Sequence, residues 1–181
     1  LDFESRIYAK VNAPELLRRE LAKPSYVAEP IALGVNTDAY QPCERERQLT
    51  RRVLEVLHEC EHPVALITKS SLIERDIDIL APMAARRLAA VAVTVTTLDP
   101  IIARTLEPRA AAPVRRLRTI RTLTEAGIPV GVSIAPMSAA WAARAAMNAC
   151  IGKMMAASPG QKDHAMATWM GSYLAQNISG L

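Results

Sequence analysis

Four apolar runs each end in a cluster of polar residues: IALGVNTD (31–38), VALITKSS (64–71), VAVTVTTLD (91–99) and VGVSIAPM (130–137). Between each run and the next, apolar residues recur at helical spacing. Strands that alternate with helices in this way are typical of repeated β-α units and a parallel sheet. We therefore predict an α/β fold whose functional groups lie just beyond the carboxyl ends of the strands.

The composition fits one domain with a substantial core. The 181 residues are 50% hydrophobic but only 4% aromatic, so the core is expected to consist of Ala, Val, Leu and Ile. No apolar run approaches the roughly 18 residues of a membrane span, and the first residues do not resemble a signal peptide. Three widely spaced cysteines favour a reducing, cytoplasmic location over a disulfide framework. The net charge of +4 permits an anionic ligand or nucleic acid without requiring either.

Proline, glycine and polar residues mark the expected element boundaries. The first strong strand is predicted over 31–35. Inward positions of the last regular helix are expected to be Val114, Leu117, Ile120 and Leu123. Helices are predicted at about 13–23, 46–60, 72–88, 100–106 and 113–126, with Pro82 kinking or dividing the third.

Lys69 is the sharpest single candidate for a functional residue. It follows a buried strand, at the predicted mouth of the sheet, with Ser70 beside it. A lysine there can hold an anionic group as a point charge, or act as a Schiff-base amine if it is desolvated. It can equally be a solvated residue of a β-α loop.

Two further polar groups are expected at the same edge. Thr94 and Thr96 are two residues apart, so their hydroxyl groups share one face of the third strand. That face can meet a ligand, although threonine also suits a strand by propensity alone. Asn36, Thr37 and Asp38 follow the first strong strand and can either contact a ligand or form an ordinary turn.

An arginine-rich segment follows Glu107 and Pro108. Arginines here can pair with a carboxylate in two-point fashion or contact nucleic acid, and they can also form the solvated face of an amphipathic helix. The segment lacks interleaved aromatic residues for base stacking. Its members are Arg109, Arg115, Arg116, Arg118 and Arg121.

His58, Cys60 and His62 show a spacing that suggests metal binding, but their geometry is poor. On a helix, the two histidines would share a face from which Cys60 points away, and Pro63 stops the helix. The sequence contains no CxxC pair, no phosphate-binding glycine loop and no GxSxG motif. These motifs therefore identify no reaction class.

Seven segments along residues 2–137 together carry a family resemblance: DFESRIYAKVNAPELLRREL, PIALGVNTDAYQP, LTRRVLEVL, ITKSSLIERDIDIL, VAVTVTTLDP, LEPRAAAPVRRL and EAGIPVGVSIAPM. In this order they resemble the radical S-adenosylmethionine proteins related to spore photoproduct lyase, also described as DNA repair photolyase-like. The resemblance rests on the succession of segments rather than on any single motif.

The resemblance implies a partial (βα)6 barrel, of which about four βα units lie in this chain. It also implies a 4Fe–4S cluster held by a CxxxCxxC motif, reductive cleavage of S-adenosylmethionine to a 5′-deoxyadenosyl radical, and flavodoxin or ferredoxin as reductant. It places Thr37 and Asp38 at the amino end of S-adenosylmethionine, Lys69 and Thr94 at its carboxylate and ribose, and Pro136 near its adenine. The residues expected around this cofactor are Asn36, Thr37, Asp38, Lys69, Ser70, Thr94, Thr96 and Arg109.

The sequence departs from the family pattern at both ends. It contains no CxxxCxxC motif, and Cys43, Cys60 and Cys150 match none of its positions. We therefore expect a fragment of such an enzyme, from a truncated or frameshifted reading frame, that is inactive as this chain and holds no metal. We expect a partial barrel over 1–137 and an atypical, Ala- and Met-rich helical tail over 138–181. The substrate is undefined, and nucleic acid is one candidate.

Overall fold

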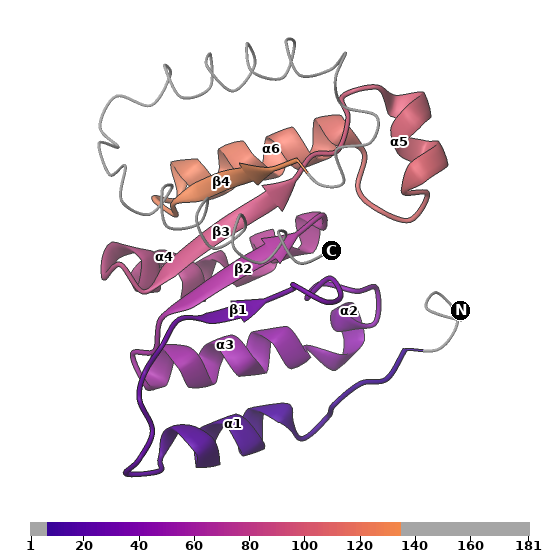
Figure 1. Cartoon of the computed structure of the whole chain (residues 1–181). Coiled ribbons are helices and arrows are strands. Elements are labelled where there is room, and N and C mark those ends of the chain that lie inside the picture. Colours follow the sequence, from indigo (N-terminus) through magenta and orange to yellow (C-terminus); the bar gives the residue numbers. More distant parts are fainter. Residues whose placement is uncertain (1–6, 135–181) are drawn as a thin grey trace, which may run out of the picture.

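A sheet of four parallel strands forms the centre of the fold (Figure 1). The computed structural model describes residues 7–134. The strands pair in the order of the sequence, which confirms the predicted α/β fold. They are β1 (Ile31–Leu33), β2 (Val64–Thr68), β3 (Ala89–Thr94) and β4 (Val130–Ser133).

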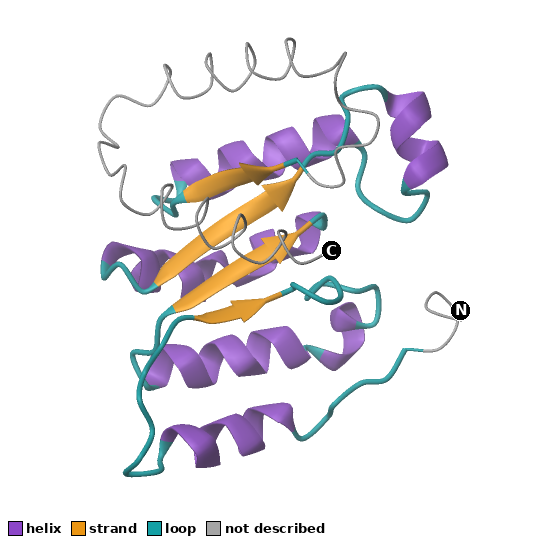
Figure 2. Ribbon diagram, viewed as in Figure 1, coloured by secondary structure: helices purple, strands orange, loops and turns teal. Residues whose placement is uncertain are grey.

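Helices fill the connections between these strands (Figure 2). α1 precedes the sheet, α2 and α3 join β1 to β2, η1 and α4 join β2 to β3, and α5 and α6 join β3 to β4. None of the helices within residues 7–134 is long and apolar enough to cross a membrane. Their bounds are α1 Ala13–Leu21, α2 Glu44–Arg47, α3 Leu49–Glu59, η1 (a 3-10 helix) Ser71–Asp76, α4 Ile77–Ala85, α5 Pro100–Leu106 and α6 Pro113–Glu125.

The hydrophobic core lies between one face of the sheet and helices α3, α4 and α6. Leu66 and Val91 are register partners in β2 and β3, and both are fully buried. They belong to one apolar cluster with Leu57 of α3, Leu80 of α4 and Leu123 of α6. Because successive side chains alternate across a strand, the intervening residues point to the opposite face. Those residues are mostly small: Ala32, Ala65, Ala90, Ala92 and Gly131.

The first strand is shorter than predicted, because the backbone turns at Gly34. Gly34 has a φ of +87°, and a Cβ atom there would lie 2.0 Å from the carbonyl oxygen of Ile67. The strand therefore ends at Leu33 rather than at residue 35. The close approach brings the loop after β1 onto the end of β2, and only glycine fits that contact.

Two predicted helices are divided at places that the apolar pattern does not mark. Gln48, with a φ of 49°, separates α2 from α3, so the helix expected over 46–60 begins at Leu49. The helix expected over 72–88 is divided between Asp76 and Ile77, whereas Pro82 lies inside α4. Local turns thus override the periodicity of the apolar residues in both segments.

The last regular helix begins at Pro113 and ends at Glu125, close to the predicted bounds. Ile120 and Leu123 are buried as expected, but Val114 is 60% exposed, which corrects its assignment to the core. The buried residues of α6 include Pro113, Arg116, Ile120 and Leu123, and Val114 lies off the face that they form. The expected tail over 138–181, the domain boundary near residue 137 and the position of Pro136 lie outside the described residues.

Candidate functional site

The loop after β1 is tied to the end of β2 by Asp38. One carboxylate oxygen of Asp38 accepts from the Thr68 hydroxyl at 2.6 Å and from the Tyr40 backbone N–H at 2.9 Å. The other accepts from the Lys69 backbone N–H at 2.8 Å. Asp38 therefore fixes the backbone of Lys69 at the carboxyl edge of the sheet.

Lys69 forms an ion pair with a residue that follows α5. Its Nζ lies 2.6 Å from Oε1 of Glu107, and the two side chains are 35% and 11% exposed. The other oxygen, Oε2, accepts from the Thr96 hydroxyl at 3.0 Å and from the Arg116 guanidinium at 2.6 Å. We call these four residues the Glu107 cluster. It joins the chain segments that follow β2 and β3 to helix α6.

Arg116 is the buried anchor of the Glu107 cluster. Only 2% of its side chain is exposed. Its Nε donates to the carbonyl oxygen of Ala111 at 2.6 Å, and Nη1 donates to that of Thr94 at 2.9 Å. The guanidinium thus holds the end of β3, the α5–α6 connection and Glu107 together, as its planar array of donors permits.

The electrostatics of the Glu107 cluster favour a charged carboxylate. Burial raises the pKa of Glu107, but hydrogen bonds from Lys69 and Arg116 and the charges of both cations outweigh it, so its pKa lies below the ordinary value of 4.5. Two cations share this one carboxylate. The edge of the sheet therefore presents a partly exposed ammonium group backed by a buried ion pair.

The structure corrects the interpretation of the arginine-rich segment as one solvated face. Arg116 is buried, and Arg115 makes a two-point contact with Glu74 at 2.5 and 2.7 Å. Arg118 and Arg121 are exposed. The helix turns these side chains in different directions, so the segment is not one basic surface.

The other predicted site residues have varied positions. Asn36 and Thr37 are exposed on the loop after β1. Ser70 caps η1, where its hydroxyl accepts from the Leu72 backbone N–H at 3.2 Å. Thr94 is buried at the end of β3, and Arg109 is exposed two residues after Glu107. The structure thus links three of the predicted residues. Asp38 is hydrogen-bonded to the Lys69 backbone, and Lys69 and Thr96 both contact Glu107.

Sequence reasoning missed Glu107 and Arg116 as members of the site. In the sequence, Glu107 stands out only as the residue before Pro108 and Arg109, and Arg116 only as one of five arginines. One signal was present: Glu107 is the only acid between Asp99 and Glu125. A lone carboxylate in a basic segment has many cations to pair with, but the pairing depends on the fold.

A second buried network stabilises the region beneath the same edge. Asp76 is fully buried and accepts from the Tyr40 hydroxyl at 3.0 Å, from Arg51 at 3.0 Å and from Arg75 at 2.8 Å. Arg75 also donates to Glu44 at 3.0 Å. Burial, followed by the charge and hydrogen bond of Asp76, raises the pKa of Tyr40 well above its usual range. These groups satisfy one another, so the network is structural.

The described residues do not fit an iron–sulfur cluster. Cys43 precedes α2 and Cys60 follows α3, so an eleven-residue helix lies between them. Over residues 7–134 no group of three or more His, Cys, Asp or Glu side chains is placed to hold a metal ion. His62 is buried, with its ring bonded to the Tyr26 hydroxyl at 2.7 Å.

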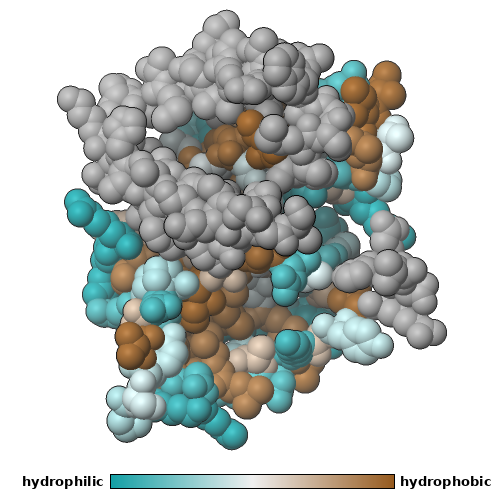
Figure 3. Space-filling view, in the orientation of Figure 1, coloured by the Kyte–Doolittle hydropathy of each residue, from teal (hydrophilic) through white to brown (hydrophobic). Residues whose placement is uncertain are grey.

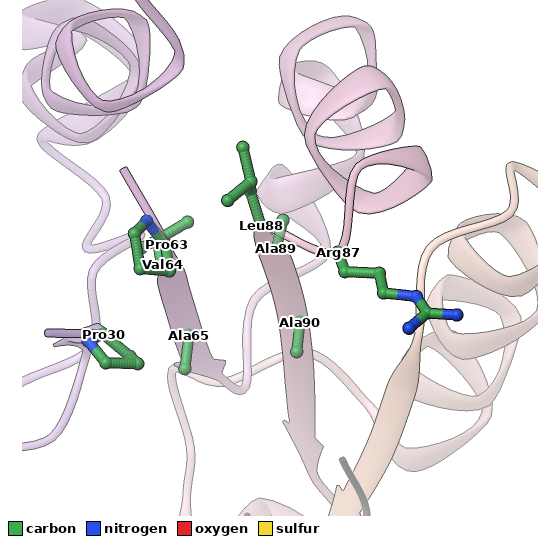
Figure 4. Close-up of a pocket in the computed structure, with 8 residues that line it drawn as sticks. All are labelled: Pro30, Pro63, Val64, Ala65, Arg87, Leu88, Ala89 and Ala90. Atoms are coloured by element: carbon green, nitrogen blue, oxygen red, sulfur yellow. The ribbon is translucent and has the colours of Figure 1, made fainter. Parts of the chain in front are cut away.

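A hollow of about 250 Å³ opens at the opposite, amino edge of the sheet (Figure 4). Its walls are mostly apolar, and the charged side chain of Arg87 extends away from the other labelled residues. Parallel α/β sheets place their chemistry at the carboxyl edge, so the Glu107 cluster, and not this hollow, is the candidate site. The lining residues are Pro30, Pro63, Val64, Ala65, Arg87, Leu88, Ala89 and Ala90.

Helix α5 adds an apolar surface on the carboxyl side of the sheet (Figure 3). Ile101, Ile102 and Leu106 are 77%, 40% and 57% exposed. Asp99 caps this helix by accepting from the Ile101 and Ile102 backbone N–H groups at 2.7 and 3.1 Å. The site thus combines a charged cluster with an exposed apolar helix at its margin.

The fold and the site define an α/β protein with a charged cluster at the carboxyl edge of a parallel sheet. Uncharacterized proteins of Mycobacterium tuberculosis and Mycobacterium bovis are each 34% identical to it over 136 residues, 75% of this chain and 40% of the relative. An uncharacterized protein of Methanocaldococcus jannaschii is 26% identical over 133 residues, 74% of this chain and 48% of the relative. The chain thus spans less than half the length of these curated relatives. No protein-family model and no solved structure matches it.

Proposed function

We propose that this chain is the S-adenosylmethionine-binding part of a radical S-adenosylmethionine enzyme of the photoproduct lyase-like type. The observation that carries the proposal is the Glu107 cluster at the carboxyl edge of β2 and β3. Its partly exposed Lys69 offers a cation to the carboxylate of the cofactor. The order of the strands supports the proposal, because a barrel wall is built from consecutive parallel strands.

The proposal assigns S-adenosylmethionine binding and no radical step to these residues. In an enzyme of this type, a 4Fe–4S cluster supplies the electron that cleaves S-adenosylmethionine. The 181-residue sequence contains no CxxxCxxC motif, so the cluster ligands must come from outside it. The reductant, flavodoxin or ferredoxin, and a substrate such as nucleic acid rest on the family resemblance alone.

Two expected ligand contacts are modified by the geometry. Asp38 uses both carboxylate oxygens on hydrogen bonds within the chain, so we assign it the role of fixing Lys69 rather than contacting the amino group. The Thr96 hydroxyl is buried and donates to Glu107, so we assign it the role of holding that carboxylate rather than contacting the ligand. Lys69 is accordingly the central ligand contact of the proposal.

The two other functions considered for this sequence are less well supported. A Schiff-base lysine needs a free amine, but the Lys69 amine is engaged in an ion pair with Glu107. A nucleic-acid-binding face needs its arginines free to reach phosphates, but Arg115 and Arg116 are engaged with Glu74 and Glu107. Both functions therefore require present ion pairs to break.

Binding of S-adenosylmethionine to the whole chain tests the proposal. Saturation-transfer NMR, which detects affinities in the millimolar range, would compare the wild type with Lys69→Met. Loss of a hydrogen bond to a charged group costs about 1.5–3 kcal/mol, so we expect at least tenfold weaker binding. The matched control is Lys23→Met, because Lys23 lies beyond the end of α1 and pairs with the neighbouring Glu20.

Two results would contradict the proposal. One is the absence of any transfer to S-adenosylmethionine in the wild type, and the other is equal binding by the Lys69 and Lys23 variants. Anaerobic iron–sulfur reconstitution of a protein that includes the adjoining coding sequence tests the radical part separately. Visible cluster absorbance is expected there, and its absence would refute the radical chemistry while leaving cofactor binding intact.

A further inference from the structure

We infer that Glu107 is a positioning residue, which holds the Lys69 ammonium so that its remaining N–H donors face the carboxylate of the ligand. This inference rests on the proposed function, because it concerns the same cofactor site. It goes further by assigning a role to a residue that contacts no ligand in that proposal. The argument depends on the different surroundings of the two Glu107 oxygens.

The two oxygens of Glu107 divide the cluster into a buried and an exposed half. Oε2 accepts from Arg116 at 2.6 Å and from Thr96 at 3.0 Å, both of which are buried. Oε1 lies 2.6 Å from Nζ of Lys69, whose side chain is 35% exposed. The carboxylate therefore connects a fixed interior group to a cation at the surface.

The buried half is held rigidly. Arg116 donates to the carbonyl oxygens of Ala111 and Thr94 as well as to Glu107, so its guanidinium is oriented by three acceptors. A planar guanidinium with several donors in use has little freedom to turn. Glu107 consequently keeps a defined position relative to the end of β3.

The exposed half is suited to receive an anion. A lysine ammonium has three N–H donors, and Glu107 Oε1 can occupy only part of that capacity. A free lysine side chain loses rotamer entropy when it is fixed. Because Glu107 already restrains Lys69, the ligand avoids much of that loss.

A thermodynamic cycle with two ligands tests this role. The variants are Glu107→Gln, Lys69→Met and the double variant, and the probes are S-adenosylmethionine and 5′-methylthioadenosine, which lacks the amino-acid group. We expect Glu107→Gln to weaken S-adenosylmethionine binding about tenfold and to change 5′-methylthioadenosine binding less than about twofold. In the Lys69→Met background, Glu107→Gln should have no further effect.

Controls separate this role from a general loss of structure. Glu20→Gln changes an exposed acid of α1 and should leave both ligands unaffected. Unfolding midpoints report whether each variant is folded. If Glu107→Gln does not fold, Glu107→Asp retains the charge with a shorter reach, and we expect it to weaken S-adenosylmethionine binding selectively.

The inference would be overturned by the following outcomes. Tighter S-adenosylmethionine binding by Glu107→Gln would mean that Glu107 competes with the ligand for Lys69. Unchanged binding would mean that Glu107 has no effect on how Lys69 binds the ligand. Equal weakening of both ligands, or the same loss in the Lys69→Met background, would indicate a purely structural role. If the wild type binds neither ligand, the proposed function fails as well. If Lys69→Met weakens binding but Glu107→Gln does not, the inference fails and the proposed function survives.

Discussion

Replacement of Arg116 by methionine is the most direct test of the energetics of the Glu107 cluster. The change retains much of the apolar stem but removes all three hydrogen bonds of the guanidinium. Glu107 then loses its buried cation, and the carbonyl oxygens of Ala111 and Thr94 lose their donor. Removal of one partner from a buried ion pair costs about 3–5 kcal/mol.

We place the expected loss near the lower end, at about 3 kcal/mol, because Glu107 keeps its contacts with Lys69 and Thr96. A domain of this kind is stable by only about 5–15 kcal/mol, so the change is a large fraction of the total. With a urea dependence of about 2 kcal/mol per molar, the midpoint of unfolding should fall by about 1.5 M.

Urea unfolding of Arg116→Met and of Arg118→Met provides the measurement and its control. Arg118 lies on the same helix but is exposed, so its replacement should leave the midpoint almost unchanged. The double variant Arg116→Met/Glu107→Gln should lose less than the sum of the two single variants, since both disrupt one ion pair. Equal midpoints for the Arg116 and Arg118 variants would refute the assignment of Arg116 as a buried anchor.

Three further predictions concern the turn, the second network and pH. Gly34 and Gly127 both have a positive φ, but only at Gly34 would an added Cβ clash with β2. Gly127→Ala is expected to cost about 1–2 kcal/mol, and Gly34→Ala clearly more. Similar urea midpoints for the two variants would contradict this. Tyr40→Phe removes the hydroxyl that donates to buried Asp76, so the free energy of unfolding should fall by about 1.5–3 kcal/mol in thermal or urea unfolding. An unchanged free energy of unfolding would exclude a structural role for that bond. The pKa of Glu107 is lowered on folding, so its stabilising effect is fully present above pH 4.5 and disappears as the pH falls through the folded pKa. The difference in unfolding free energy between wild type and Glu107→Gln should therefore shrink below pH 4.5. A difference that stays constant would contradict the charged state of Glu107.

The order and type of the main elements were predictable because they depend on local pattern. The runs at β2 and β3 are continuous and apolar, as expected of strands covered on both faces. Pro100 and Pro113 correctly predicted the starts of α5 and α6, since proline fits the first turn of a helix. Element boundaries were less predictable where a single backbone conformation decides them, as Gln48 does between α2 and α3.

The candidate site was predictable only in part. Lys69 was identified because a lysine directly after a buried strand must lie at the edge of the sheet. Its partner Glu107 lies on a different connection, and the contact depends on how α5 turns back toward β2. Arg116 shows the same limit: its sequence context resembles that of exposed Arg118, but the rotation of α6 directs it inward.

The sequence by itself determined the alternation of strands and helices, the parallel sheet and the polar residues at its carboxyl edge. These features follow from spacing along the chain, which acts over a few residues. Only the tertiary structure decided which charges pair, because Lys69, Glu107 and Arg116 come from three segments that meet through packing of α5 and α6 on the sheet. A side chain's partner depends on the three-dimensional position of both groups, and that position is not encoded in the neighbours of either one.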